Sequence, residues 1–314
     1  MTIYLGLDIG GTSAKYGLVD ESGTIIDRDR FPVKAHHRGA DDIIDEAIEQ
    51  LRSMINRNGA ASQVAGLAIG AAGWILPNQG VVVAAPNLPG WHHVALGPRL
   101  SKALNLPVIM ENDANLYTLG EWLCGAGQGL NYLVGVTLGT GVGGGLILNG
   151  RLYNGPFGTS AEVGHMVVEP NGRKCKCGSY GCLETLASAT AMTVTGRELL
   201  EQGHATSFTG QAEGLNSKVL FDLADEKDPL AMEVFNRAGK ALGIALTSIL
   251  NLLGLEGAVI GGGAGAAFKH MYDSMFEEFS KRVFVVDPDK VRLVQSALGD
   301  DAPLAGAPAL FKVG

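Results

Sequence analysis

Long hydrophobic runs are missing from this chain of 314 residues. No run reaches the roughly 18 apolar residues that a membrane helix needs, so we expect no membrane partner. Cysteine is scarce as well, and three of the four cysteines fall between positions 175 and 182. Such clustering does not fit a disulfide framework and favours a reducing, cytoplasmic setting. The N-terminal run carries no basic leader, which argues against a secretion signal.

Positive charge is also in short supply. Lysine and arginine number 24 against 32 acidic residues, and the net charge is −8. This balance disfavours long-range attraction of nucleic acid or polyphosphate. It remains compatible with a small anion held by backbone amides. We therefore expect small-molecule partners and no nucleic acid.

Glycine, by contrast, is abundant. The 45 glycines make up about 14% of the chain, roughly twice the average usage. They stand in clusters, which favours tight turns and close approach of the backbone to a ligand. The length allows one large domain or two ordinary ones.

The two halves of the chain begin alike. Residues 5–12 align without gaps on residues 134–141, each as a strand, a glycine turn and the start of a second strand. The repeat indicates an ancient duplication and two related lobes; the alternative is chance similarity of two glycine-rich hairpins. Elsewhere strands alternate with amphipathic helices, most clearly at 43–55 and 228–253. This order predicts α/β lobes with a cleft between them.

Three glycine clusters are candidates for binding phosphate. The first is Asp8-Ile9-Gly10-Gly11-Thr12, in which amides and the Thr12 hydroxyl would face phosphate oxygens and Asp8 would hold Mg²⁺ through water. The second is the loop 138–145, and the third is Gly261-Gly262-Gly263 between a strand and a helix. Simple tight turns or a β-bulge are the structural alternatives. None has the Gly-Lys-Ser/Thr ending of a Walker A loop.

A carboxylate pair at a strand end is the candidate for proton transfer. In Glu111-Asn112-Asp113-Ala114-Asn115, a carboxylate would take the proton from a hydroxyl that attacks phosphorus, and Asn112 would bind the same substrate. Alternatively, Asn112 or Asp113 is a helix N-cap.

The cysteine cluster predicts a structural zinc site. Cys175, Cys177 and Cys182 with the upstream His165 form a closed ligand set, which leaves no position for a catalytic water. The alternative is a set of free thiols. Zinc would fix the loop that carries Glu162 and Glu184, two acids that are candidates for hydrogen bonds to sugar hydroxyls. Cys124 is expected to be a buried thiol.

The whole set of motifs, in this order, resembles the ROK family of sugar kinases and sugar-responsive repressors, and within it the bacterial ATP-dependent glucokinases. The segments that carry the resemblance are 8–12, 87–91, 111–115, 138–143, 162–165, 175–184 and 261–263. The cysteine segment with its flanking acids is the most specific of them.

The resemblance implies an actin-like, ribonuclease H-like fold with an N-terminal α/β lobe at 1–115 and a larger C-terminal lobe at 116–314. It also implies that the final helix packs back on the N-terminal lobe. It implies that ATP phosphorylates a hexose, with glucose to glucose 6-phosphate as the first choice and Asp113 as the general base. It also implies a homodimer or higher oligomer.

The resemblance further assigns residues to ligands. The implied sugar contacts are Asn87, Asn112, Glu162, His165 and Glu184. The implied nucleotide contacts are Asp8, Gly10, Gly11, Thr12, Gly139, Thr140, Gly141, Gly262 and Gly263. The implied zinc ligands are His165, Cys175, Cys177 and Cys182.

Two departures from the family pattern keep other functions open. The loop 71–80 lacks the usual Pro-Gly pair, and Thr185-Leu186-Ala187-Ser188 replaces an aromatic and Ser-Gly. Rival hypotheses are a kinase for another hexose or an N-acetylated amino sugar, a polyphosphate-dependent kinase, and a sugar-sensing regulator. The last is disfavoured because the first strand begins at residue 3, which leaves no room for a winged helix.

Overall fold

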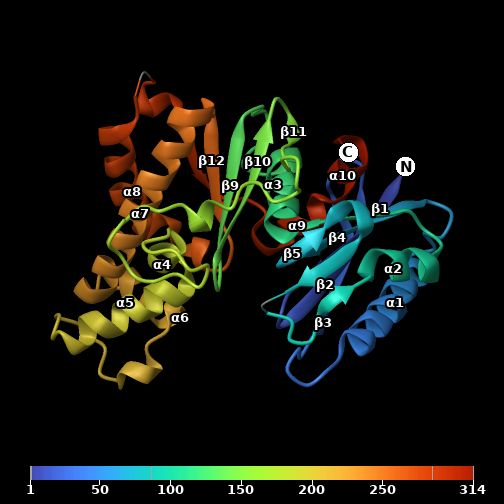
Figure 1. The fold of residues 1–314 in the computed structure, drawn as a ribbon, viewed down its shortest axis with the longest axis horizontal. Helices are drawn as coiled ribbons and strands as arrows, with labels where there is room; N and C mark the ends of the chain where they lie inside the picture. Colours follow the sequence, from blue (N-terminus) through green and yellow to red (C-terminus); the bar gives the residue numbers. More distant parts are fainter. Residues whose placement is uncertain (1, 86, 285, 314) are drawn as a thin grey trace. The chain divides into compact units, whose positions relative to one another are not determined.

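The computed structural model describes residues 2–85, 87–284 and 286–313 (Figure 1). The chain forms two compact units, each built from separate stretches of sequence. The first unit comprises Met1–Asn131, Gly145–Ser160 and Asp300–Gly314, and the second comprises Tyr132–Gly144 and Ala161–Gly299. Each unit is described by itself below.

A mixed five-stranded sheet is the centre of the first unit. Its order is β3-β2-β1-β4-β8. Strand β1 pairs antiparallel with β2 and parallel with β4, which in turn pairs parallel with β8. The strands are β1 (Ile3–Ile9), β2 (Ser13–Asp20), β3 (Ile25–Pro32), β4 (Val64–Ala71) and β8 (Val108–Asn112).

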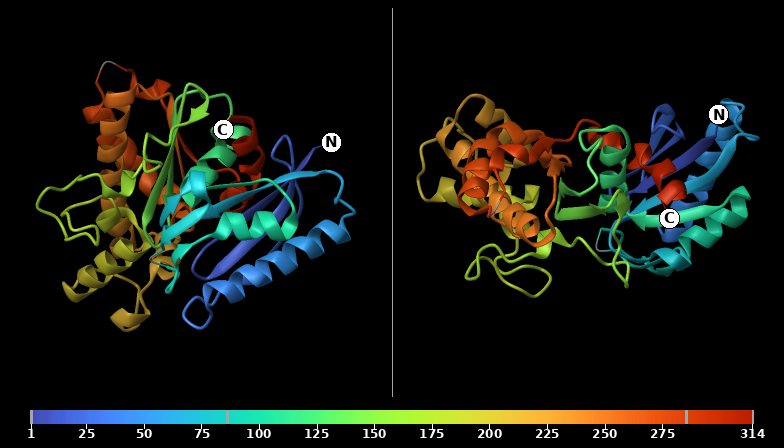
Figure 2. Two further views of the ribbon diagram at one scale, coloured as in Figure 1. Left: turned by 45° about the vertical axis from the view of Figure 1, so that its right-hand side comes forward. Right: turned by 90° about the horizontal axis from the view of Figure 1, so that it is seen from above.

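Helices cover both faces of this sheet, and the alternation of side chains along β1 decides which helix lies where. Leu5, Leu7 and Ile9 are fully buried in one core with the apolar stripe of α1 (Ala40–Arg57), while α2 (Leu96–Leu104) lies beside α1. Helices α3 (Asp113–Cys124), α9 (Ala302–Ala305) and α10 (Ala307–Val313) contact the sheet as well. In Figure 2 the blue α1 and the red C-terminal helices lie on opposite sides of the first sheet.

The glycines of the other face admit the C-terminal helices. A Cβ atom at Gly6 would lie 3.1 Å from the Leu304 side chain, so α9 packs directly on the backbone of β1. Tyr4 stacks on Phe311 with ring centroids 5.0 Å apart. The last helices therefore complete the unit that the first strand begins.

A small antiparallel sheet extends the first unit. It consists of β5 (Trp74–Leu76), β6 (Val81–Ala84) and β7 (His92–Val94), with the short turn η1 (Pro77–Gln79) between the first two. Trp91 precedes β7, is fully buried in the core, and anchors the loop that carries Asn87.

The second five-stranded sheet has the order β11-β10-β9-β12-β13. Its central strand β9 corresponds to β1 in the predicted repeat, and β10, β11 and β12 occupy the positions of β2, β3 and β4. The shared strand order agrees with two lobes of common origin. The strands are β9 (Leu133–Leu138), β10 (Val142–Leu148), β11 (Arg151–Leu152), β12 (Gly257–Gly261) and β13 (Arg292–Gln295).

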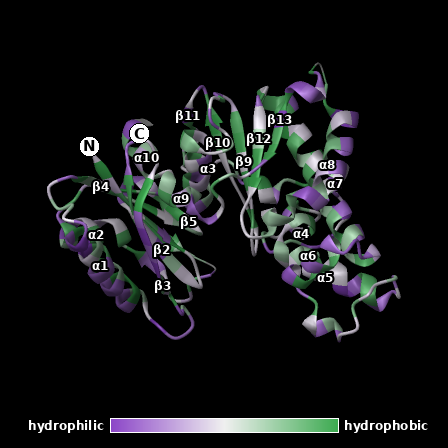
Figure 3. Cartoon of the chain, turned by 180° about the vertical axis from the view of Figure 1, so that it is seen from behind, coloured by the Kyte–Doolittle hydropathy of each residue, from purple (hydrophilic) through white to green (hydrophobic). Residues whose placement is uncertain are grey.

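Helices make up most of the rest of the second unit. The longest, α7 (Pro229–Leu253), begins at the Asp228 N-cap and packs against α8 (Phe268–Arg282). The others are α4 (Glu184–Ala187), α5 (Ala189–Glu201) and α6 (Ser217–Asp225), with short 3₁₀ turns η2 (Val163–His165), η3 (Ala212–Gly214), η4 (Ala264–Ala267) and η5 (Pro288–Lys290). The turn η6 (Gly299–Asp301) spans the point at which the chain returns to the first unit. In Figure 3 the strand β9 is coloured largely hydrophobic, whereas the sheet edge around β2 and β3 and much of α1 carry hydrophilic colouring.

The α/β class is confirmed, and so are the amphipathic helices predicted at 43–55 and 228–253, to within three residues at each end. Short elements such as β5, β7, α4 and α6 were not predicted. The compact units differ in their bounds from the lobes at 1–115 and 116–314, a division that stays a prediction. No helix among the described residues is long and apolar enough to span a membrane.

Close packing of α7 on α8 predicts a large cost for one methyl group. A Cβ atom at Gly239 would lie 2.1 Å from the Ser274 hydroxyl and 2.4 Å from the Met271 carbonyl oxygen. We expect Gly239→Ala to lower the free energy of unfolding by about 1–3 kcal/mol, measured by urea denaturation. Gly214→Ala is the control, because the nearest atom there is 3.8 Å away. Equal stability of both variants would contradict this packing.

Candidate active site and metal centre

Two carboxyl groups of the first unit lie on either side of Gly70. Asp8 on β1 is in register with Gly70 on β4, and Asp113 follows the neighbouring strand β8. A Cβ atom at Gly70 would lie 3.4 Å from Asp8 Oδ1 and 3.6 Å from Asp113 Cα. The sheet register therefore brings together the predicted magnesium ligand and the predicted base, which are 105 residues apart in the sequence.

Both carboxyl groups hold their protons more tightly than ordinary aspartates. Burial, followed by the negative charge of Asp113, raises the pKa of Asp8 from 3.8 to about 7, against the lowering effect of Lys15. Burial also raises the pKa of Asp113, and the Ala114 amide partly offsets it. Paired carboxyls with raised pKa values are typical of sites that move protons or bind cations.

The first glycine turn lies against the loop that carries Asn87. A Cβ atom at Gly11 would lie 2.5 Å from the Asn87 carbonyl oxygen. The Gly10 amide donates to Ser13, and Val33 donates to the Thr12 carbonyl. Glycine is thus required at Gly11 by close approach of backbone, and the turn brings Thr12 and Asn87 to the same end of β1.

Asn112 is the N-cap of α3. Its Oδ1 accepts from the Ala114 amide at 2.9 Å and from the Asn115 amide at 3.4 Å. Asp113 is the first residue of the helix and accepts from the Ala114 amide at 2.9 Å. The N-cap alternative is therefore confirmed for Asn112, and the capped helix start fixes the direction of Asp113.

In the second unit, two glycine clusters lie side by side. A Cβ atom at Gly262, whose φ is +79°, would lie 2.6 Å from the Leu138 carbonyl oxygen just before the loop 139–141. That loop is fastened to the start of α5 by bonds from the Ala189 amide to Gly139 and from the Thr190 hydroxyl to Thr140. The space above Gly139 and Gly263 is open, because a Cβ atom at either would meet nothing within 4 Å.

Glu184 connects the cysteine loop to the second glycine cluster. Its Oε2 accepts from the Val142 amide at 3.1 Å, and a Cβ atom at Gly141 would lie 2.4 Å from the same oxygen. Glycine at this position therefore makes room for the carboxylate. Glu162 lies at the start of η2, the turn that carries His165.

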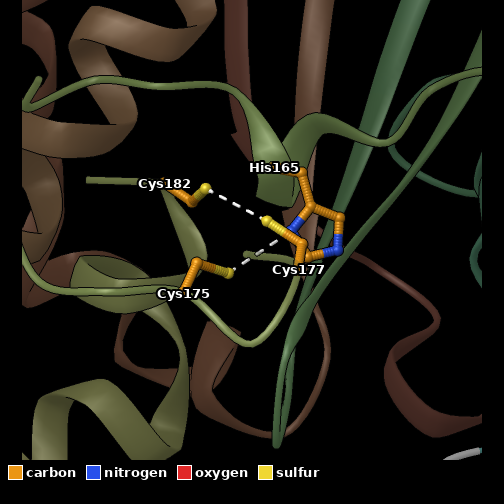
Figure 4. A group of neighbouring side chains, drawn as sticks. All are labelled: His165, Cys175, Cys177 and Cys182. Atoms are coloured by element: carbon orange, nitrogen blue, oxygen red, sulfur yellow. Dashed lines mark hydrogen bonds between the residues drawn. The ribbon is translucent and has the colours of Figure 1, made fainter. Parts of the chain in front are cut away.

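His165, Cys175, Cys177 and Cys182 converge in the second unit (Figure 4). Their ligand atoms all lie within 4.8 Å of one another. Cys175 Sγ is 3.6 Å from His165 Nδ1, and Cys177 Sγ is 3.7 Å from Cys182 Sγ. Tetrahedral zinc bonds of about 2.3 Å to sulfur and 2.0 Å to nitrogen require about 3.5 Å between a nitrogen ligand and a sulfur ligand, and about 3.8 Å between two sulfur ligands. The distances between these ligand atoms therefore fit a zinc ion, for which thiolate and imidazole are the usual ligands.

Backbone geometry, without any metal, already shapes this loop. Isolated bridges join Val167 to Cys182 and Lys174 to Tyr180. Gly181 has φ +66°, and a Cβ atom there would lie 1.5 Å from the Glu169 carbonyl oxygen. Only glycine can occupy that position, which sets the approach of Cys182 to the other thiols.

The predicted site residues thus fall into two groups. The first unit holds Asp8, Gly10, Gly11, Thr12, Asn87, Asn112 and Asp113, and the second holds Gly139, Thr140, Gly141, Glu162, His165, Glu184, Gly262, Gly263 and the three cysteines. Sequence reasoning overlooked Gly70 and Thr190. A glycine inside an otherwise buried strand was the available signal for Gly70, while nothing local distinguished Thr190.

A family model described as the ROK family matches residues 4–313. The chain belongs to the ROK family. A glucokinase of Thermotoga maritima is 36% identical over 98% of this chain and 96% of its own length. A ROK glucokinase from Streptomyces griseus, solved in complex with glucose and AMPPNP, is 32% identical, covers 99% of this chain with 100% of its own, and superposes with a TM-score of 0.80.

Regulators are among the ROK relatives too. The xylose repressor of Bacillus subtilis is 29% identical over 96% of this chain, which spans 75% of the repressor. The family resemblance and the two-lobed kinase fold expected from sequence are both confirmed.

The raised pKa of Asp8 predicts how stability of this ROK protein depends on pH. Because the folded state holds the proton until about pH 7 and the unfolded state only until 3.8, the contribution of Asp8 to stability falls as pH rises through that window. In the unchanged protein this effect should lower the free energy of unfolding by roughly 2–4 kcal/mol between pH 4 and 7.5. We expect Asp8→Asn to abolish that decrease, as measured by urea denaturation without nucleotide.

Asp20 provides the opposite control. Hydrogen bonds from Ser22, and secondarily from Thr24, lower its pKa, so Asp20→Asn is expected to cost stability above pH 4. If Asp8→Asn has the same pH profile as the unchanged protein, Asp8 does not carry a raised pKa.

Proposed function

We propose that this ROK protein transfers the terminal phosphoryl group of ATP to a hexose, with glucose as the first choice and the 6-hydroxyl as the acceptor. The observation that carries the proposal is the carboxyl pair Asp8 and Asp113 around Gly70, at the end of the strand that leads into the first glycine turn. Phosphoryl transfer requires a positioned base and a cation near the phosphates, and this corner offers a carboxyl for each.

Asp113 acts as the general base in this proposal. Its raised pKa makes the ionised carboxylate a stronger acceptor for the sugar proton than an ordinary aspartate. Its place at the capped start of α3 limits the directions that it can take. Holding the sugar hydroxyl in position to attack the phosphorus then supplies the rest of the rate acceleration, because a correctly placed nucleophile needs little further activation.

The remaining assignments concern ligand binding. Amides of Gly10, Gly11 and Thr12 hold phosphate oxygens in the first unit, and those of Gly139, Thr140 and Gly141 do so in the second, with Gly262 and Gly263 near the adenosine. Asp8 holds Mg²⁺ through water. The sugar hydroxyls are held by Asn87, Asn112, Glu162, His165 and Glu184.

We assign a structural zinc ion to the Cys3His cluster. His165 Nδ1 faces Cys175, so Nδ1 is the ligand atom and Nε2 points elsewhere. Zinc supplies folding energy and rigidity to the loop and takes no part in the reaction, because the protein provides all four ligands. The loop in turn sets Glu184, which touches the second glycine cluster.

A sugar-sensing regulator is the second candidate, favoured by the similarity to xylose repressors. It shares the expectation of sugar binding but not that of ATP turnover. A kinase for another hexose keeps every role above and changes only the acceptor. We also propose a homodimer, as the family resemblance implies, and a reducing, cytoplasmic setting, in line with the free cysteines.

The first test is ADP release from MgATP across a panel of hexoses. Asp113→Ala should reduce kcat at least about a hundredfold, because the base is lost, while sugar affinity measured by calorimetry stays within a few-fold. Asp289→Ala, at an exposed position in η5, is the control. Near-normal turnover by Asp113→Ala defeats the base assignment, and silence on every hexose with intact sugar binding favours the regulator.

Zinc content gives an independent test of the metal centre. We expect about one zinc ion per chain, and Cys177→Ser should lose it and unfold at lower temperature. Cys124→Ser should retain the metal, since Cys124 lies in the other unit and contacts the Gly23 and Gly120 carbonyls. A zinc-free preparation with undiminished stability speaks against this assignment.

A further inference from the structure

Glu111 is a buried carboxylate to which the proposed reaction gives no role. It is the last residue but one of β8, two residues before Asp113, and it is 3% exposed. Its Oε1 accepts from the Asn112 backbone amide at 2.8 Å and from Asn115 Nδ2 at 3.0 Å. Its Oε2 accepts from Asn154 Nδ2 at 2.6 Å.

These partners are unusual, because a buried carboxylate is ordinarily paired with a cation. The described part of the chain offers Glu111 no ion pair with lysine, arginine or histidine. Amide donors hold a carboxylate in a fixed direction, since each has one N–H aimed at one oxygen. The amide donors thus fix the direction of the Glu111 carboxylate without neutralising its charge.

The side chain of Asn115 indicates which group sets the geometry. Its Nδ2 faces Glu111, and its buried Oδ1 has no hydrogen-bond partner among the residues that the structure describes. Rotating the amide by half a turn would direct an oxygen at the Glu111 carboxylate. Glu111, together with the Asn154 Oδ1 that accepts from the same Nδ2 at 3.3 Å, therefore determines the orientation of Asn115, even at the expense of an unpaired acceptor.

One arm of this cluster surrounds Asp113. Glu111 binds the amide of Asn112 before it and the side chain of Asn115 after it, while Asn112 caps the same helix turn. The peptide that leads into Asp113 and the turn that follows it are both fastened to the Glu111 carboxylate. A small rotation of Glu111 would therefore turn the Asp113 side chain.

The other arm reaches the segment 153–160, which connects β11 to Ala161 and Glu162 along the chain. Asn154 is its anchor, because Asn154 bonds both Glu111 and Asn115. Gly155 and Gly158 have φ of +63° and +69°, and Ala161 has φ of +61°, a conformation that strains a residue with a side chain. The segment thus needs an external contact to keep its course.

We propose that Glu111 is a positioning residue for the proposed kinase, acting with Asn154. Its carboxylate sets the direction of Asp113 at the start of α3, and through Asn154 it fixes the segment that precedes Glu162 in the chain. This inference rests on the proposed function for its kinetic part, whereas the fastening of residues 153–160 is independent of any activity.

A reciprocal exchange tests the contact. In Glu111→Gln, the new amide Nε2 would face Asn154 Nδ2, so that two donors oppose each other. In Asn154→Asp, two carboxylates would meet. In the double variant, Gln at 111 donates to Asp at 154, while its Oε1 keeps both remaining donors. Each single variant should lower kcat about tenfold or more, and the double variant should return to within about threefold of the unchanged protein.

The kinetic readout separates positioning from mere stability. Asp113 acts in the transition state, so kcat should fall while the dissociation constant of the hexose changes less than about threefold. Glu121→Gln is the control: Glu121 is fully buried further along α3, where its carboxylate accepts from Ala126 at 2.8 Å. That variant should lose stability but keep its kcat.

Hydrogen exchange supplies the activity-independent readout. Amides of 153–160 should exchange faster in Asn154→Asp and regain protection in the double variant. Asn154→Ala, which adds no charge, should show the same faster exchange if Asn154→Asp does not fold. Unchanged exchange in these variants, or a double variant no better than the worse single one in kcat, overturns the proposal. If no hexose is turned over by the unchanged protein, the proposed function fails. The exchange data still decide whether the hydrogen bond between Glu111 and Asn154 fastens residues 153–160.

Discussion

Parallel pairing of β1, β4 and β8 is the constraint on which the candidate catalytic corner depends. The register places Asp8, Gly70 and Glu111 in one row across three strands. Side chains in one row point to the same face of a sheet, so Asp8 and Glu111 lie on the same face, with Gly70 between them. Asp113 follows two residues after Glu111, at the start of α3. No single segment contains this arrangement, since the three strands come from distant parts of the chain.

Charge placement at this corner carries a cost that the fold must offset elsewhere. Burial raises the pKa of Asp8 to about 7, which means that its ionised form is disfavoured in the folded protein. Apolar burial on the opposite face supplies compensation, because Leu5, Leu7 and Ile9 are fully enclosed with α1. Alternation along one strand thus separates a stabilising face from a reactive face.

Much of this was accessible from sequence, and the reasons are local. Glycine clusters, the cysteine spacing and the apolar stripe of α1 depend on residues near one another, so their patterns are legible in the chain. The role of Asn112 as N-cap was one of two open readings, and hydrogen bonding decided it. The partners of Glu111 were not accessible, because Asn154 lies 43 residues away and belongs to no recognisable motif. The small strands β5 and β7 span three residues each, too few for a periodic pattern.

The difference between local and long-range contacts also predicts which substitutions disturb the Cys3His cluster and which disturb the carboxyl corner. The proposed zinc ligands are brought together by short-range turns, and at position 181 only glycine leaves room for the Glu169 carbonyl oxygen. Their geometry is therefore set within one loop and needs no distant strand. The carboxyl corner depends on a local helix cap, but also on sheet register and on Asn154, two contacts of long sequence separation. Changes far from Asp113 in sequence can accordingly alter its direction, whereas the cysteine loop responds chiefly to changes within itself.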